Sequence, residues 1–184
     1  MILPIVAYGD PVLRQVAKDV SKDNASLSQL ISDMKETLKN SGGVGLAAPQ
    51  VGESVRVFLV DGARMSEEFQ KTFINAKITD QRGDEWEFEE GCLSIPRVRA
   101  MISRKYEVDI EYLDENFEPQ KETYTGILAR IIQHEYDHIE GKLFIDKMTP
   151  LKRKIIIHHL VKISKGEVET KYEMKQWKPT KSTN

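Results

Sequence analysis

Residues 125–141 read TGILARIIQHEYDHIEG, and this stretch has the apolar spacing of an α-helix. His134 and His138 lie four residues apart, so a helix places both imidazoles on one face, where they can bind the same metal ion. Glu135 follows His134 and is placed to hydrogen-bond a water held by such an ion, as a general base does. The pattern therefore predicts a metal site on this helix; the alternative is a surface helix that carries the motif by chance.

The neighbours of the two histidines favour the metal site, because they are apolar on more than one side of the helix. A buried histidine beside a carboxylate is unfavourable unless it is paired, and a metal ion is the simplest partner. Asp137 has two interpretations, a group that orients a ligand or a charge on the helix surface. The apolar residues are Ile127, Leu128, Ala129, Ile131, Ile132, Ile139, Leu143 and Phe144.

Length and composition predict one soluble domain. The chain has 184 residues, 40% of them hydrophobic and 30% charged, which suffices for one core and is short for two. The net charge of -2 and the pI near 6.1 give no support for sequence-specific nucleic-acid binding. No apolar run approaches the roughly 18 residues of a membrane span. We expect a cytoplasmic protein with a single domain over residues 1–165 and a tail, 166–184, whose end is disordered.

The order of the expected elements defines the fold class. Proline and apolar spacing predict helices over 11–17, 26–39 and 150–164, besides the helix at 125–141. Strands are expected over 55–60, 72–78, 84–90, 106–113 and 120–125, the last two as a hairpin. This order is not a regular βαβ alternation. It predicts an α+β fold, with mostly antiparallel strands around a buried central helix and a further helix near the C-terminus.

The glycine-rich segment 42–50 invites comparison with a phosphate-binding loop. It lacks the Gly-Lys-Ser/Thr sequence of such a loop and the dinucleotide-binding fingerprint, so we set phosphate binding aside. Two interpretations remain: a turn packed by small residues, or a backbone that approaches a ligand closely. In the second, Gln50 is the polar side chain able to hydrogen-bond the ligand.

A catalytic metal site commonly has three protein ligands, so the helix leaves one to be found. His158 and His159 are consecutive and point about 100° apart on a helix, which favours solvated surface positions. A downstream carboxylate is a further candidate. Cys92 is the better one, since a thiolate is a good ligand and the preceding glycine lets the backbone pass close to the ion. As the sole cysteine it forms no intramolecular disulfide, and its alternative role is that of a small buried hydrophobe.

Three segments together resemble the signature motifs of the peptide deformylase family, in the same order and spacing. They are GVGLAAPQ at 43–50, EGCLS at 90–94 and QHEYDH at 133–138. The resemblance extends over nearly the whole chain, and the helix near the C-terminus resembles that of the bacterial type I group. Ala76 departs from the family pattern, which usually has proline there; the departure concerns the rigidity of that loop.

The resemblance implies a metal-dependent hydrolase that removes the N-formyl group from the N-terminal methionine of nascent polypeptides and releases formate. It implies one Fe(II) ion per chain, which Zn, Ni or Co can replace. Glu135 would be the general acid and base, while Gln50 and the backbone N–H of Leu93 would hold the developing oxyanion. The implied metal ligands are Cys92, His134 and His138.

The resemblance also implies a pocket for the methionine side chain. Arg130 and Ile131 precede His134 by four and three residues, which independently puts them near the metal-facing side of the helix. For Arg130 we hypothesise that the stem packs along the pocket wall and the guanidinium reaches solvent at the rim. The implied substrate-binding residues are Val44, Gly45, Phe88, Glu90, Gly91, Ile127, Arg130 and Ile131.

Two competing functions, and a contact with the ribosome, are also suggested by the sequence. A zinc peptidase shares the HExxH pattern, but usually takes its third ligand downstream. A structural metal domain would need four ligands and would leave Glu135 without a role. Basic residues of the last helix are able to contact ribosomal RNA phosphates, although a solvated helix face is the favoured interpretation. They are Lys152, Arg153, Lys154, Lys162 and Lys165.

Overall fold

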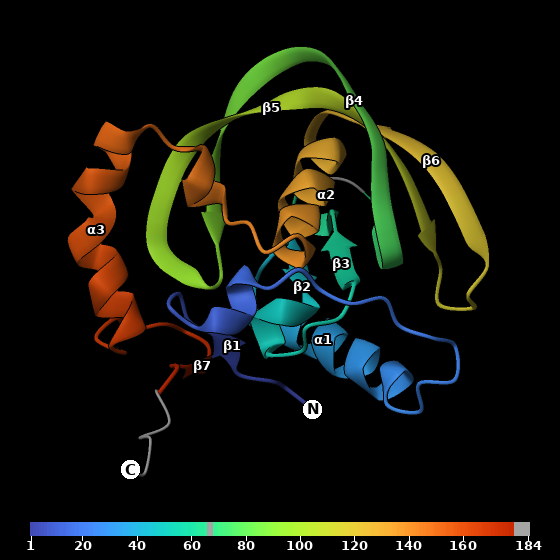
Figure 1. The fold of residues 1–184 in the computed structure, drawn as a ribbon, viewed down its shortest axis with the longest axis horizontal. Coiled ribbons are helices and arrows are strands. Elements are labelled where there is room, and N and C mark those ends of the chain that lie inside the picture. Colours follow the sequence, from blue (N-terminus) through green and yellow to red (C-terminus); the bar gives the residue numbers. More distant parts are fainter. Residues whose placement is uncertain (66–67, 179–184) are drawn as a thin grey trace.

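The computed structural model describes residues 1–65 and 68–178, and its centre is one helix enclosed by a curved antiparallel sheet. Figure 1 shows β4 and β5 arching over α2 (Gly126–Ile139). The α+β class predicted from the element order is confirmed. The sheet has the order β2 (Gly45–Ala47), β3 (Val57–Asp61), β4 (Gln70–Cys92), β5 (Ile95–Leu113) and β6 (Pro119–Thr125).

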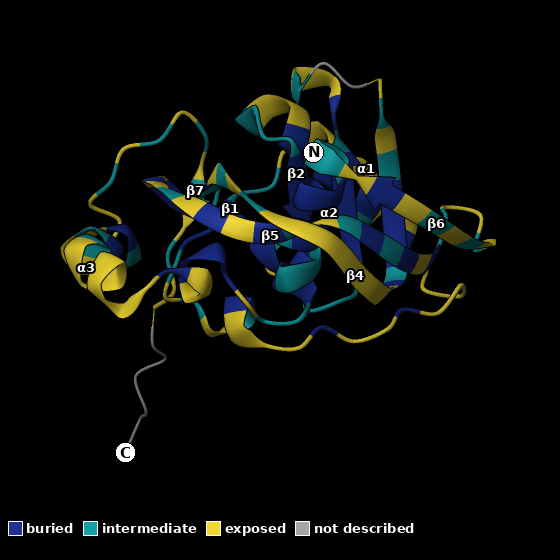
Figure 2. Cartoon of the chain, turned by 90° about the horizontal axis from the view of Figure 1, so that it is seen from above, coloured by how far each residue is buried: buried dark blue, intermediate teal, exposed yellow. Residues whose placement is uncertain are grey.

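Helix α2 is buried, as its apolar neighbours predict (Figure 2). Ala129 and Ile132 are fully buried and share a cluster with Phe58, Val108 and Ile110 from the sheet. Apolar packing of this kind contributes roughly 25 cal/mol for each Å² removed from water. The helix is therefore held rigidly against β2, β3, β5 and β6, and its polar side chains take their directions from that packing.

Strands β4 and β5 form a hairpin much longer than the sequence predicts. The separate strands expected at 72–78 and 84–90 are parts of the single strand β4, with register irregularities at several places along its pairing with β5. Residues 79–83 between them are exposed but belong to the same strand, so their polarity does not mark a loop. Asn75, with φ 51°, bonds both backbone groups of Val20, and the neighbouring Ala76 is fully buried.

The remaining helices lie close to their predicted positions. Helix α1 (Leu27–Ser41) ends at Gly42, whose φ of 74° is a left-handed cap that glycine adopts without strain. Helix α3 (Pro150–Ser164) is capped by Thr149, whose hydroxyl oxygen accepts a hydrogen bond from the N–H of Lys152. The expected helix at 11–17 is shorter, a 3₁₀ helix η1 (Pro11–Arg14). Further 3₁₀ turns are η2 (Ala48–Val51), η3 (Ala63–Met65) and η4 (Phe144–Lys147).

The two ends of the described chain meet in a small parallel sheet. Strand β1 (Ile5–Val6) pairs with β7 (Met174–Lys175). The predicted division at residue 165 stays a prediction, although part of the predicted tail pairs in this way. Residues 179–184 of the end expected to be disordered lie outside the described residues. Among the helices of 1–65 and 68–178, none combines the length and apolar composition of a membrane-spanning segment.

Candidate metal centre

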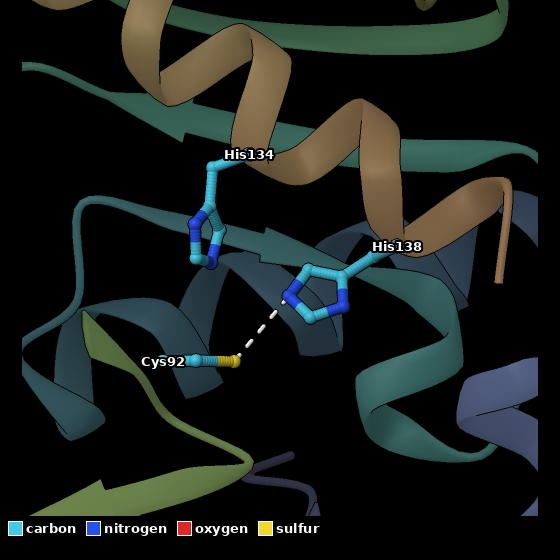
Figure 3. A group of neighbouring side chains, drawn as sticks. All are labelled: Cys92, His134 and His138. Carbon is cyan, nitrogen blue, oxygen red and sulfur yellow. Dashed lines mark hydrogen bonds between the residues drawn. The ribbon is translucent and has the colours of Figure 1, made fainter. Parts of the chain in front are cut away.

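Helix α2 and the end of β4 bring together the three predicted metal ligands. Figure 3 shows His134 and His138 projecting from the helix toward Cys92. The Sγ of Cys92 lies 3.3 Å from Nε2 of His138, and one ligand atom from each residue lies within 4.8 Å of the others. Within residues 1–65 and 68–178, this is the one such cluster of three or more potential ligands.

The donor set fits a divalent transition metal. A thiolate and two imidazoles suit zinc and ferrous iron, and three protein ligands leave a coordination position for water or substrate. Burial lowers the pKa of His138 well below its ordinary value, and the neutral form that this favours is the one that binds a metal. A closed structural site would require a fourth protein ligand.

The histidines of α3 are not part of this cluster. His158 is exposed, as predicted for a solvated helix surface. For His159 that prediction is wrong, because the ring is half-buried and its Nε2 lies 3.0 Å from the carbonyl oxygen of Pro96. His159 therefore has a packing partner that its position in the sequence did not reveal.

Glu90 orients the His134 ring through the nitrogen that does not face the ligand cluster. Its Oε2 lies 2.9 Å from Nδ1 of His134, which leaves Nε2 of that ring for the metal. Arg104 donates to both carboxylate oxygens of Glu90, at 2.6 and 3.0 Å, and also to Asp137 at 2.8 Å. Burial alone would raise the pKa of Glu90, but the hydrogen bonds from His134 and Arg104 hold it well below its usual value. Asp137 is thus the outer member of a network that orients a ligand, not a free surface charge.

Arg130 is the clearest correction to the sequence-based predictions. Its guanidinium does not reach solvent at a pocket rim, since the residue is only 2% exposed. One terminal nitrogen donates to Glu90 and the carbonyl of Ile102, at 2.6 and 2.9 Å, and the other to the carbonyl of Trp86, at 2.5 Å. The guanidinium also lies 4.3 Å from the ring centre of Trp86. A buried carboxylate and a strand backbone supply the partners that make burial of this charge tolerable.

Glu135 is buried next to His134, with Oε2 free of protein hydrogen bonds. Burial raises the pKa of Glu135 to about 7, a value suited to proton transfer near neutral pH. Its carboxylate packs directly on Gly45: a Cβ built there would come within 2.3 Å of Oε1. The second motif glycine of the segment 43–50 is therefore needed to make room for the Glu135 side chain.

Gln50 and Leu93 flank Cys92. The backbone N–H of Ala47 donates to Oε1 of Gln50 at 2.9 Å, which turns the amide nitrogen toward Cys92. That nitrogen lies 3.4 Å from both Sγ of Cys92 and Oγ of Ser94. Leu93 follows Cys92 in the turn between β4 and β5. Both predicted oxyanion donors therefore lie next to a predicted ligand.

A cavity of about 760 Å³ opens beside these groups, and all eight predicted substrate-binding residues line it. Phe88, Ile127 and Ile131 supply apolar surface, while the charged ends of Glu90 and Arg130 are already paired. The full predicted set in its wall is Val44, Gly45, Phe88, Glu90, Gly91, Ile127, Arg130 and Ile131. Gln50, Cys92, Leu93, His134 and Glu135 also line the cavity.

Two functional elements were missed from the sequence. Arg104 shares the inward-facing alternation of Ile102 and Val108, and that two-residue period could have revealed it. Residues 169–172, in the predicted tail, line the cavity, and the hydroxyl of Tyr172 donates to the carbonyl of Leu93 at 2.8 Å. Tyr172 and Met174 alternate with charged residues, which was a weak strand signal. Burial, helped by the nearby Cys92, raises the pKa of Tyr172 to about 12.

Comparison with known sequences identifies the family to which the chain is similar. The model of the polypeptide deformylase family matches residues 2–154. The peptide deformylases of Christiangramia forsetii and Flavobacterium psychrophilum are each 50% identical to the chain over 188 aligned residues. The alignments cover 95% of this chain, and 96% and 97% of the two relatives.

Solved structures show the same similarity in three dimensions. The crystal structure of a peptide deformylase from Legionella pneumophila aligns with a TM-score of 0.82 at 40% identity, covering 91% of this chain and 98% of that one. The peptide deformylase from Thermotoga maritima aligns with a TM-score of 0.76 at 39% identity, covering 82% and 99%.

Proposed function

Because the chain belongs to the polypeptide deformylase family, we propose that Cys92, His134 and His138 hold its metal ion and that Glu135 transfers the protons of the reaction. The reaction itself is that of the family. The protein is a metal-dependent hydrolase that removes the N-formyl group from the N-terminal methionine of nascent polypeptides and releases formate. This assignment replaces the zinc-peptidase and structural-metal alternatives.

The proposed ion is Fe(II), with Zn, Ni or Co able to replace it. The support is the ligand set of one thiolate and two imidazoles, which suits these borderline metals and not Mg²⁺ or Ca²⁺. When bound, such an ion acts as a Lewis acid and makes a water molecule a good nucleophile at neutral pH.

Glu135 is proposed to take a proton from the attacking water and to pass it to the leaving amine. A C–O bond to the formyl carbon forms, the formyl C–N bond breaks, and the products are formate and a free N-terminal amine. The observation that carries this role is a buried carboxylate beside the ligand cluster, with one oxygen free of protein hydrogen bonds. Its pKa near 7 allows it to accept and return a proton at little free-energy cost.

The amide of Gln50 and the backbone N–H of Leu93 are proposed to donate to the oxygen of the formyl group as negative charge develops on it. The hydrogen bond from Ala47 orients the Gln50 amide before substrate arrives. Donors that need no reorganisation during the reaction are worth about 2.7–4 kcal/mol each in comparable sites.

The methionine side chain is proposed to lie against Phe88, Ile127 and Ile131, the apolar part of the cavity wall. Val44, Gly45 and Gly91 would then border the peptide backbone. Glu90 and Arg130 support this wall through their mutual ion pair, with Nη1 of Arg130 2.6 Å from Glu90. Their contribution to selectivity is therefore proposed to be indirect.

The deciding experiment measures formate release from a formyl-Met peptide by protein prepared without oxygen and loaded with Fe(II). Glu135→Gln should lower kcat by about 10²–10⁴-fold with the metal still bound, the usual range for loss of a general acid–base. Glu87→Gln, the same change at an exposed site on β4, is the matched control and should match the wild type. Full activity in Glu135→Gln would refute its proposed role.

A ribosome contact through α3 is proposed, with the protein acting in the cytoplasm, where chains are synthesised. Lys152, Lys154 and Lys162 are exposed on this helix and can meet RNA phosphates. Replacing these three by alanine should abolish a salt-sensitive co-sedimentation with ribosomes. Such substitutions are preferable to truncation after Pro150, because truncation would remove the buried Leu160 and Ile163. Absence of binding by the intact protein would refute the contact.

A further inference from the structure

The turn that carries the proposed oxyanion donor has an unusual conformation for its length. Cys92 pairs with Ile95, so Leu93 and Ser94 form a two-residue hairpin loop. Two-residue loops usually require positive φ at one or both positions. Neither Leu93 nor Ser94 has a positive φ. The register instead shifts between Gly91 and Cys92, and Arg97 takes a positive φ of 63°. Bonds from outside the hairpin hold both carbonyl groups of the turn.

Those outside bonds come from the two ends of the chain. The backbone N–H of Tyr8 donates to the carbonyl of Ser94 at 2.9 Å, and the hydroxyl of Tyr172 donates to the carbonyl of Leu93 at 2.8 Å. Tyr8 lies just after β1, and Tyr172 lies just before β7. Both turn carbonyls are thus held by segments that flank the same two-stranded sheet.

The terminal sheet has its own backbone bonds. The N–H of Ile5 donates to the carbonyl of Glu173, and the N–H of Ala7 to that of Lys175, both at 2.9 Å. Figure 1 shows β1 and β7 side by side below the end of the β4–β5 hairpin where its turn lies. Met174 packs against the buried cores on this side of the molecule. The sheet is therefore anchored well enough to hold the Tyr172 ring in place.

We propose that Tyr172 is a positioning residue of the hydrolysis, which holds the Leu93 turn through its hydroxyl and so keeps the Leu93 N–H and the Cys92 thiolate in their working places. This inference rests on the proposed function of Leu93 and Cys92. Tyr172 also lines the cavity beside the metal ligands. Without the hydroxyl, that carbonyl loses its partner and the turn gains freedom to move.

The test compares two tyrosine-to-phenylalanine variants of the full-length, metal-loaded protein. Tyr172→Phe should lower kcat about five-fold, the rate equivalent of one ordinary hydrogen bond, with KM for a formyl-Met peptide within two-fold of wild type. Tyr112→Phe is the matched control. It removes a tyrosine hydroxyl that donates to Glu122 at 2.6 Å, at the far end of β5 from the turn, and should leave kcat unchanged.

A second measurement follows the Cys92 thiolate without turnover. In Co(II)-substituted protein, Tyr172→Phe should change the thiolate-to-cobalt absorption band, whereas Tyr112→Phe should not. Equal kcat and an unchanged band in Tyr172→Phe would overturn the proposal, and so would a change in KM alone. Glu135→Gln, measured alongside, distinguishes failure of the Tyr172 proposal from failure of the proposed function. If Glu135→Gln is inactive, an unaltered Tyr172→Phe variant overturns only the positioning role of Tyr172. If Glu135→Gln is fully active, the proposed function of the site is overturned as well.

Discussion

Helices α2 and α3 have nearly the same length, 14 and 15 residues, and each contains four isoleucines and two histidines. In α2 the histidines lie four residues apart on a face that meets Cys92 and Glu90. In α3 they are consecutive and point in different directions, one to solvent and one to the carbonyl of Pro96. Equal numbers of isoleucines and histidines thus give a cluster of potential metal ligands at α2 and none at α3 among the described residues, because histidine spacing and surrounding partners differ.

The two helices also differ in what their apolar residues do. In α2, Ile131 and Ile132 are buried under the sheet, while in α3 Leu151 and Ile155 are 71% and 74% exposed. Figure 2 shows this contrast as a blue central helix and a largely yellow one at the edge of the molecule. Only a helix enclosed on several sides can keep water away from a reactive carboxylate such as Glu135.

The sharpest test of the comparison replaces one histidine in each helix. His138→Ala should abolish metal retention and lower deformylase activity at least about 10³-fold, because a bound metal contributes several kcal/mol to such reactions. His158→Ala should change neither quantity. Metal content by elemental analysis and formate release check both. Retained metal and activity in His138→Ala would show that the i, i+4 pair is not the ligand set.

A second test compares buried and exposed arginines. Arg104→Met leaves the buried Glu90 without its main cation, and loss of one partner from a buried pair lowers the free energy of unfolding by about 3–5 kcal/mol. Arg153→Met, on the exposed side of α3, should change it by less than about 0.5 kcal/mol. Urea unfolding of both variants measures the difference. Similar losses in the free energy of unfolding for the two variants would contradict the conclusion that α2 has buried charged partners and α3 has exposed ones.

Gly45→Ala probes how closely α2 is enclosed. The added methyl group would overlap the side chain of Glu135. That side chain is flexible, so it can move aside. We expect a roughly 10²-fold lower kcat, as for an active group displaced by about 1 Å, with little loss of thermal stability. Formate release and a melting curve separate the two effects. If Gly45→Ala were stable and kept the wild-type kcat, the close contact between Gly45 and Glu135 would not be needed for activity.

The smallest expected effect concerns the segment that joins the helices. Partial burial raises the pKa of Asp146, but hydrogen bonds from Arg14 and the N–H of Leu143 outweigh it, and the pKa is lowered in the folded state. A lowered carboxyl pKa contributes stability above the unfolded value of 3.8, and this contribution is lost as pH falls through the folded value. Asp146→Asn should therefore lower stability at pH 7 by about 0.5–1 kcal/mol. The difference in unfolding free energy between the wild type and Asp146→Asn, measured by urea unfolding, should vanish in acid. An unchanged difference at pH 2 would contradict this prediction.

Local spacing predicted much of the site. The positions of His134, Glu135 and His138 follow from the period of one helix, and the motif around Cys92 identified the third member of the cluster. Tertiary partners decided the rest. Arg130 lies on the predicted side of α2, but its burial depends on Glu90 and on the carbonyl of Trp86, which come from a strand distant in sequence.

The strands were predicted less well than the helices. Residues 79–85 are polar because β4 extends beyond the covered part of the sheet, and polarity alone resembles a loop. The short strands β1 and β7 have only two residues each, too few for a periodic signal. Their pairing joins residues from opposite ends of the chain, which no local pattern records.

The sequence by itself determined the α+β class, the central helix and the shared helix face of His134 and His138, because helical period is a local property. The tertiary structure alone decided how the buried charges of Glu90, Arg104 and Arg130 pair, why Gly45 must lack a side chain, and that Tyr172 reaches Leu93. The reason is physical: burial and hydrogen bonding depend on which distant segments meet, whereas periodicity depends only on neighbours along the chain.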